Sequence, residues 1–310
     1  MQQIIQCVPN FSEGRDQATI EAIARALRSV EGVRLIDHSS DVDHNRSVYT
    51  MLGGPEPIRA AIVAAVSEAV ERIDLRDHDG AHPRIGAADV IPLVPLRGIT
   101  MGECIETSYL IGEDLAGLGI PVYYYERSAT RVHRSNLADL RRGGFERLRA
   151  VELDGECAPD AGPCMVHPSA GVTVIGARGP LVAYNINLGG TDIDAAREIA
   201  CLTRAALSGL TGVKAIGVWL ASRSIAQVSM NITRPDLVSL KQVFDHVRDQ
   251  AAERGIEVLE SEVIGVIPQK SLAGTTPEEL RITSFKDLQI LDTWLDDTTW
   301  FPGANRNKAV

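Results

Sequence analysis

The sequence has little that points to a secreted, membrane-bound or metal-stabilised protein. Its five cysteines are odd in number and irregularly spaced, with no C-x-x-C pair, so the pattern indicates neither a disulfide framework nor a zinc site. No window approaches ~18 consecutive apolar residues, which argues against a membrane-spanning helix. The N-terminal MQQIIQCVPN lacks a basic region followed by a long apolar stretch and does not read as a secretory signal. We therefore expect a cytoplasmic protein with reduced thiols.

Positive charge is also scarce. The 310 residues carry a formal net charge of −10, whereas nucleic-acid binding requires a basic face. The balance therefore excludes a nucleic-acid partner and favours small-molecule ligands. An anionic ligand would have to be held by a few arginines placed locally.

Apolar periodicity predicts alternating strands and helices in the first half of the chain. Strands are predicted at residues 3–8, 33–37, 48–52, 88–95 and 121–125. Helices are predicted around residues 20–27, 58–73 and 101–117. This is the β-α-β-β-α-β order of a ferredoxin-like fold, elaborated at its end.

The same order is predicted again after a segment rich in turn formers at residues 143–170. Strands are predicted at 172–177, 181–188, 213–220, 225–233 and 262–267, and helices at 192–208 and 237–254. We expect an N-terminal domain at 1–170 and a C-terminal domain at 171–310. The predicted fold class is α/β (α+β), with two tandem ferredoxin-like sandwiches.

Amide side chains share one face of two strands in the second half. Asn185 and Asn187 alternate with apolar residues in 181–188, and Gln227 does so in 225–233. Either this is a solvated sheet face, or it lines a ligand site. Exposed strands usually carry Thr, Lys and Glu rather than amides, which favours the ligand surface.

The segment from His78 to Asp89 joins a predicted helix to a predicted strand and is the richest in reactive side chains. Glycines allow tight turns in it, and Pro83 stiffens the backbone beside His82. A histidine held this way is suited to proton transfer near neutral pH. Arg84 adds a cation that can pair with a carboxylate in bidentate fashion. We predict an active-site loop with His82 as its catalytic residue.

A second polar cluster runs from Asp37 to Arg46. Its His and Asp residues fit no metal-binding signature, and a polar turn between two strands is the simpler interpretation. Asn45 and Arg46, at the start of the next strand, are candidates to reach the His82 loop. Asp37 is a candidate to orient His82.

A third cluster, Asn10-Phe11-Ser12-Glu13-Gly14, lies between the first strand and the first helix. Ser12 or Asp16 can cap that helix, and the spacing favours this. A strand-to-helix turn can also direct polar groups at an anion, so Asn10 and Ser12 are kept as substrate-binding candidates.

Several of these motifs together resemble glutamate formimidoyltransferase, the domain that forms the N-terminal half of formimidoyltransferase-cyclodeaminase. The resemblance runs in order from about residue 5 to about residue 270. It rests on CVPNFSEG at 7–14, NRSVYT at 45–50, HPRIG at 82–86 followed by Asp89-Val90, PVY at 121–123, and YNINL at 184–188.

The resemblance implies a homodimeric enzyme whose two α/β subdomains hold tetrahydrofolate in a groove between them. It places His82 at the family's catalytic position and implies a step of histidine degradation. It also implies a folate-binding stretch, Gly162, Pro163, Cys164, Met165, Val166, His167, Pro168, Ser169, Ala170 and Gly171. A chain of this length is expected to release 5-formimidoyltetrahydrofolate to a separate cyclodeaminase.

The hypothesis for the chemistry is transfer of a formimino group from N-formimino-L-glutamate to N5 of tetrahydrofolate. His82 would act as base and then as acid, with Arg46 and Arg84 as clamps for the glutamate carboxylates, and no metal is expected. Three alternatives remain. The donor can be N-formylglutamate or 5-formyltetrahydrofolate. The protein can be a metal-dependent amidino-hydrolase using His38, Asp43, His44, His78 and His82, or a non-catalytic folate-binding protein.

Overall fold

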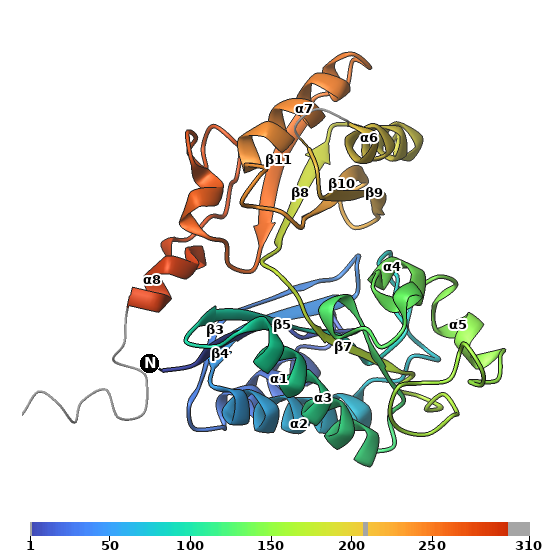
Figure 1. Ribbon diagram of the computed structural model, residues 1–310. Coiled ribbons are helices and arrows are strands. Elements are labelled where there is room, and N and C mark those ends of the chain that lie inside the picture. The colour runs from blue at the N-terminus through green and yellow to red at the C-terminus, as the bar shows by residue number, and fades with distance from the viewer. Residues whose placement is uncertain (1, 207–209, 297–310) are drawn as a thin grey trace, which may run out of the picture. The chain divides into compact units, whose positions relative to one another are not determined.

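The computed structural model describes residues 2–206 and 210–296, which form two compact units (Figure 1). The first unit runs to Arg178 and the second begins at Gly179. Each unit contains one sheet, of seven strands in the first and four in the second. The predicted α/β fold class with two tandem subdomains is confirmed.

The first unit has a ferredoxin-like core. Its elements in chain order are β1 (Ile4–Cys7), β2 (Asn10–Phe11), α1 (Gln17–Arg28), β3 (Val33–Asp41), β4 (Arg46–Gly53), α2 (Pro55–Arg72) and β5 (Ala88–Arg97). The strands lie in the order β5–β1–β4–β3, all antiparallel. The short β2 continues β1, because it pairs with the same two neighbours.

The sheet of the first unit is extended beyond β5 by two parallel strands. After α3 (Met101–Gly117) come β6 (Val122–Tyr124) and β7 (Thr173–Ala177), and β7 lies between β5 and β6. Between β6 and β7 the chain forms η1 (Glu126–Ser128), η2 (Val132–Arg134), α4 (Leu137–Leu140) and α5 (Gly144–Arg149).

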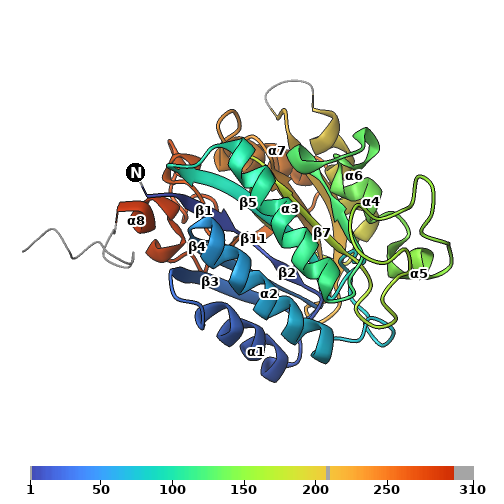
Figure 2. The ribbon, with the colours of Figure 1, turned by 60° about the horizontal axis from the view of Figure 1, so that its bottom comes forward.

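Helices α1, α2 and α3 lie side by side on one face of this sheet (Figure 2). Helix α1 shows why: Ile20, Ile23, Ala24 and Leu27 form one buried stripe. Asp16 caps the helix by accepting a hydrogen bond from Ala18 N–H at 3.0 Å. The opposite face of the sheet is therefore left for other side chains, among them the ionic cluster described below.

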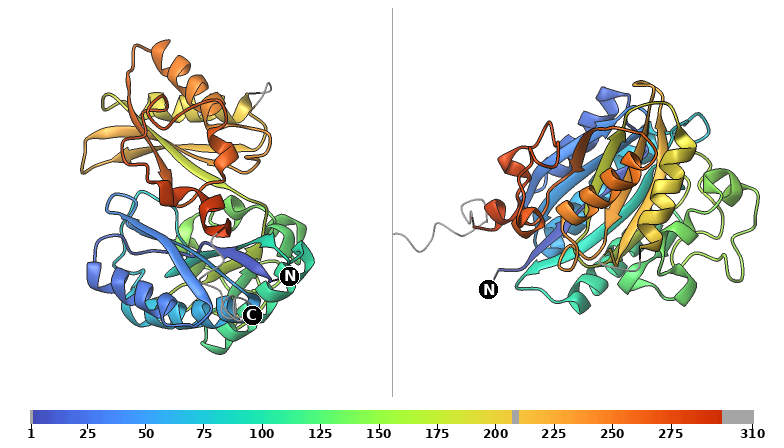
Figure 3. Two further views of the ribbon diagram at one scale, coloured as in Figure 1. Left: turned by 90° about the vertical axis from the view of Figure 1, so that its left-hand side faces the viewer. Right: turned by 90° about the horizontal axis from the view of Figure 1, so that it is seen from above.

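The second unit repeats the ferredoxin-like order. It contains β8 (Val182–Leu188), α6 (Ile193–Ala205), β9 (Val213–Leu220), β10 (Ile225–Ile232), α7 (Leu240–Ala252) and β11 (Val258–Ile264), followed by η3 (Gln269–Leu272), η4 (Asp287–Gln289) and α8 (Leu291–Asp296). The strand order is β11–β8–β10–β9. Helices α6 and α7, yellow and orange in Figure 3, lie on one face of the strands and bury the apolar face of β8 and β10. Residues 207 and 208 of the helix predicted at 192–208 lie outside the described part of the chain.

The expected domain boundary after residue 170 needs correction. The strand predicted at 172–177 pairs in parallel with β5 and β6 of the first sheet rather than starting the second. Its apolar residues identified a strand but not its partners, because the pairing with β5 joins residues about 80 positions apart. The first unit accordingly ends at Arg178. Of the domain expected at 171–310, residues 297–310 are not among those described.

Among the described residues, we find no helix with the length and apolar character needed to cross a bilayer.

Candidate active site

A buried ionic cluster lies where β2, β4 and β5 meet. Opposite Asn10 and Phe11 of β2 stand Val90 and Ala88 of β5, so Asp89 between them is the extra residue of a β-bulge. Bulges re-aim a side chain and occur often beside functional sites. The fully buried Asp89 accepts a hydrogen bond from Ile85 N–H at 2.9 Å on Oδ1. Its Oδ2 pairs with Arg46 Nη1 at 2.8 Å and with Arg141 Nη2.

The cluster contains two guanidinium groups and one carboxylate. Burial acts to raise the pKa of Asp89, but Arg141 and Arg46 outweigh it and hold that pKa well below its usual range. Burial lowers the pKa of Arg46 to about 10, with Asp89 opposing the shift and Arg141 adding to it. Asp89 and Arg46 are therefore charged at neutral pH. Two guanidinium groups against one carboxylate give the cluster a local surplus of one positive charge.

His82 lies within electrostatic reach of this cluster and has a defined tautomer. Its Nδ1 lies 2.8 Å from the carbonyl oxygen of Pro83. A carbonyl only accepts, so Nδ1 carries the proton and Nε2 presents a lone pair. Burial is the main cause that lowers the pKa of His82 well below its usual value, and Arg46 and Arg141 lower it further. The side chain is thus a neutral base at pH 7, with its ring centroid 5.8 Å from that of His44.

Asn45 joins the three loops predicted to form the site. It adopts a left-handed conformation with φ 46°, which asparagine tolerates better than most residues. Its Oδ1 accepts from Gly14 N–H and its Nδ2 donates to Asp79 O, both at 2.9 Å. Its own carbonyl accepts from His78 Nε2 at 2.9 Å. Asn45 therefore holds the 10–14 and 78–82 segments against the β3–β4 turn.

Arg84 is paired within the protein. Its guanidinium donates to both carboxylate oxygens of Glu146 at 2.8 and 2.7 Å and through Nε to His78 Nδ1 at 3.1 Å. Burial, and then the Arg84 charge, lower the pKa of His78, with its bond to Asn45 acting in the opposite direction. The contacts of Arg84 connect the His82 loop to α5.

Asn10 and Ser12 also lie in this region. Asn10 Oδ1 accepts from Arg46 Nε at 3.0 Å, which gives the arginine a second partner besides Asp89, bound to Nη1. Ser12 is buried and donates to Gly86 O at 2.8 Å. Asp16 rather than Ser12 caps the first helix, so Ser12 instead ties the first loop to the His82 loop.

Asp37 lies farther along the sheet. Asp37 of β3 pairs across the strands with Thr50 of β4. The residue of β3 that pairs with Arg46 is Asp41, four residues farther along the strand. Four residues of strand span ~13 Å. Asp89 is the carboxylate whose charge acts on His82, and the backbone carbonyl of Pro83 makes the orienting contact. Asp37 as the residue that orients His82 stays a prediction.

The end of the stretch at 162–171 is bonded directly to the His82 loop, just before β5 begins. Ala87 N–H donates to Ala170 O at 2.8 Å, and Val172 N–H donates to Ile85 O at 3.0 Å. Gly171 has φ +72°, and a Cβ there would lie 2.2 Å from Ile85 O. Only glycine permits this approach. The structure thus brings the expected folate stretch beside the His82 loop.

Asn185 and Asn187 lie on β8 in the second unit. Asn185 donates to Glu262 at 2.9 Å, and Asn187 donates to Glu260 at 3.1 Å. Gln227 joins them by donating to Asn187 at 2.9 Å. The amide face expected from the alternation therefore exists as a hydrogen-bonded network on the side of the sheet away from α6 and α7.

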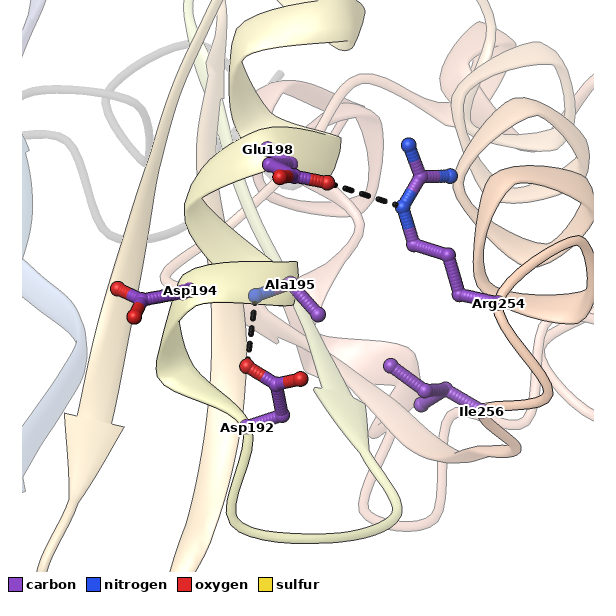
Figure 4. A pocket seen from close by; sticks show the side chains of 6 residues that line it. All are labelled: Asp192, Asp194, Ala195, Glu198, Arg254 and Ile256. Carbon is purple, nitrogen blue, oxygen red and sulfur yellow. Dashed lines mark hydrogen bonds and ion pairs between the residues drawn. The ribbon is translucent and has the colours of Figure 1, made fainter.

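Neither a metal-binding group nor the pocket of the second unit adds to the candidate active site. No group of three or more His, Cys, Asp or Glu able to hold a metal occurs within residues 2–206 and 210–296. Figure 4 shows a pocket of the second unit lined by Asp192, Asp194, Ala195, Glu198, Arg254 and Ile256. Asp192 caps α6 through Ala195 N–H, and Glu198 lies 3.4 Å from Arg254. Its acidic lining does not suit an anionic substrate.

Sequence reasoning missed two residues of the cluster, Asp89 as a charge partner and Arg141. Asp89 was quoted as the end of the His82 loop, but only the bulge shows where its carboxylate points. Arg141 lies 52 positions away in sequence from Asp89, between the strand predicted at 121–125 and the turn-rich segment at 143–170, where the sequence suggested no functional residue. The one available signal was the Leu-Arg-Arg-Gly-Gly run at 140–144, which marks a chain reversal but no chemistry.

Two family models match the chain. Residues 4–178 match the formiminotransferase domain, N-terminal subdomain, and residues 183–277 match the formiminotransferase domain. The division between the two matches falls at the boundary between the two structural units.

Curated relatives cover nearly the whole chain. A glutamate formimidoyltransferase of Streptococcus pyogenes serotype M1 is 45% identical over 95% of this chain and 99% of its own length. A glutamate formimidoyltransferase of Thermoplasma acidophilum is 38% identical over 93% of this chain and 96% of its own length. The formimidoyltransferase-cyclodeaminase of Sus scrofa is 41% identical over 88% of this chain, which matches 51% of that protein.

Proposed function

The chain belongs to the formiminotransferase family, and from this membership we propose how its residues perform the family's reaction. The chain transfers the formimino group of N-formimino-L-glutamate to N5 of tetrahydrofolate. The products are 5-formimidoyltetrahydrofolate and L-glutamate, and the reaction is a step of histidine degradation. Tetrahydrofolate is a co-substrate that leaves carrying the one-carbon unit.

The proton transfers are assigned to His82, and its hydrogen bond to Pro83 O is the observation that carries the assignment. With Nδ1 protonated, Nε2 accepts the proton of N5 as N5 bonds to the formimino carbon. The same Nε2–H then protonates the glutamate nitrogen as its bond to that carbon breaks, so the imidazole ends in its starting state. Because its pKa is lowered, the transient imidazolium is a strong acid toward the leaving amine. Such help is worth ~10²–10⁴-fold.

The remaining predicted site residues take three kinds of role: binding the donor, positioning the loops, and binding folate. Arg46, held by Asn10 and Asp89, binds the anionic donor. Asn45, Ser12 and Arg84 position the loops around His82, because their side chains are bonded within the protein. Residues 162–171 contribute to folate binding, and Asn185 and Asn187 are the contribution of the second unit.

Several finer points belong to this proposal. The first unit carries the catalytic histidine, and the second supplies a wall of the folate site. The enzyme is cytoplasmic, works as a homodimer and uses no metal. The folate groove expected between the subdomains stays a prediction.

The experiment that tests the proposed function supplies purified protein with tetrahydrofolate and N-formimino-L-glutamate and identifies the product by mass spectrometry. N-formyl-L-glutamate in place of the formimino donor is the matched control. We expect 5-formimidoyltetrahydrofolate from the first mixture and turnover with the formyl donor that is slower by orders of magnitude. A preference for the formyl donor would contradict the proposal.

A further inference from the structure

We propose that Arg141 binds a carboxylate of the glutamate moiety of N-formimino-L-glutamate together with Arg46, and that Asp89 holds the two guanidinium groups in position. The inference rests on the proposed function, which it deepens by naming the carboxylate clamp. It replaces Arg84, the second clamp predicted from the sequence, because all three guanidinium nitrogens of Arg84 already donate within the protein.

The first argument is the charge balance. Arg46 and Arg141 share one carboxylate oxygen, Asp89 Oδ2, and the side chains of both arginines are largely buried, with 9% and 12% exposed. A surplus charge in a poorly solvated place is costly unless an anion compensates it. A carboxylate of the donor would supply that anion. The net charge of the chain is −10, so this local surplus of positive charge is opposite in sign to the charge of the whole protein.

The second argument is an unsatisfied donor. Arg141 Nε is buried and has no hydrogen-bond acceptor among the residues that the structure describes. The way Asp89 is bonded explains why Arg141 Nε has no acceptor. Arg141 contacts Asp89 through Nη2 and Oδ2 alone, and Asp89 Oδ1 is directed at Ile85 N–H, so the Nε–H of Arg141 is left without a carboxylate oxygen. A buried donor left unpaired is destabilising, and an oxygen of the substrate would satisfy it.

The third argument is location. The charges of both Arg46 and Arg141 reach His82, the proposed proton carrier. A donor whose carboxylate pairs with these arginines therefore has its formimino group, a few bonds away, near the imidazole. Arg141 directly follows α4 and donates its backbone N–H to Leu137 O at 3.0 Å, so the guanidinium is carried on an ordered turn.

The test compares Arg141→Met with Arg142→Met. Arg142 is adjacent, 74% exposed and paired with Asp139, which makes it a matched control. For Arg141→Met we expect the KM for N-formimino-L-glutamate to rise by roughly 10–100-fold, the loss of a charge-assisted hydrogen bond. The KM for tetrahydrofolate should change less than about 2-fold, and Arg142→Met should behave as wild type. An unchanged donor KM in Arg141→Met would overturn the inference.

A second measurement separates binding from a structural role. N-formimino-L-glutamine lacks the γ-carboxylate, and N-formimino-4-aminobutyrate lacks the α-carboxylate. One of these two donors should show little difference in KM between wild type and Arg141→Met, because it lacks the group that Arg141 binds. Equal losses with all three donors would mean that Arg141 only supports the fold, which contradicts the inference.

A third variant guards against misfolding. Arg141→Lys keeps the charge without the planar fork, and should recover part of the lost donor affinity. If wild-type protein forms no product, the proposed function fails. If wild type turns over and both Arg141 variants keep its donor KM, only the carboxylate clamp fails.

Discussion

The chemistry of His82 depends on the charges around it. Burial is the largest cause that lowers its pKa, Arg46, Arg141 and His44 lower it further, and Asp89 acts in the opposite direction. Each neighbouring cation makes the imidazolium less favourable. The imidazole is therefore an unprotonated base at a pH where an ordinary histidine is already partly charged.

We predict that the acidic limb of the kcat/KM profile lies below pH 6.5, the usual pKa of histidine. Arg141→Met removes a charge that lowers the pKa of His82, so that pKa should rise and the limb should move to higher pH. Initial rates of wild type and of Arg141→Met, measured between about pH 4.5 and 8 in buffers of constant ionic strength, locate the acidic limb of each protein. A limb that stays in place or moves to lower pH in the variant contradicts this account of the site.

At this scale the sequence predicted part of the site. His82 was recognisable because Gly80, Pro83 and Gly86 frame it in one loop, and Asn45 and Arg46 because they follow a polar turn. Arg141 was not predictable, because its relation to Asp89 depends on a bulge and on a contact across 52 positions. The internal pairing of Arg84 likewise requires knowing where Glu146 lies.

Among the elements, a close junction joins the His82 loop to residues 171 and 172, directly before β7. A Cβ on Gly86 would lie 1.9 Å from Val172 O, and Gly171 repeats the requirement from the other side. These contacts place the 162–171 stretch beside the strand that leads away from His82. The junction therefore couples the stability of the sheet to the geometry of the site.

We expect Gly86→Ala to lower the free energy of unfolding of the first unit by about 2–3 kcal/mol, because the added methyl group must displace the backbone of Val172. Gly117→Ala is the control: nothing lies within 4 Å of its Cβ position, and alanine in a helix gains up to ~1 kcal/mol. The measurement is urea unfolding followed by the near-ultraviolet signal of tyrosine. Tyrosine suits the first unit because five of the six tyrosines of the chain lie before residue 178, whereas Trp219 and Trp294 belong to the second unit.

Equal stabilities of Gly86→Ala and Gly117→Ala would show that the junction is more compliant than its geometry indicates.

The two ferredoxin-like orders were predictable because strands and helices differ in apolar period. Helix α3 was predicted at 101–117 and occurs at Met101–Gly117. The short helices α4 and α5 were not predicted, because four and six residues are too few to show a helical period. Strand β7 was found as a strand but assigned to the wrong half, since a mostly apolar run carries no information about its neighbours.

On the scale of the whole molecule, each unit has its own sheet and its own buried apolar cluster. Strand β7 belongs to the sheet of the first unit. Among the described residues, it is the only strand of that sheet that pairs with β6. The first unit is therefore complete only when residues 171–178 are included.

We predict that a fragment of residues 1–178 unfolds cooperatively on heating, whereas a fragment of residues 1–170 does not. The shorter fragment lacks β7, which leaves β5 and β6 without the pairing that joins them. Circular dichroism melting curves of the two fragments provide the comparison, and residues 179–310 alone test whether the second unit is independent. A 1–170 fragment that melts at the same temperature as 1–178 would contradict the corrected boundary.

The central claim is that His82 carries the proton in formimino transfer, and steady-state turnover of His82→Ala tests it most directly. His133, exposed in η2, provides the control variant His133→Ala. We expect His82→Ala to lower kcat by ~10²–10⁴-fold with the dissociation constant for tetrahydrofolate nearly unchanged, and His133→Ala to match wild type. A His82→Ala protein that retains wild-type kcat would contradict the account.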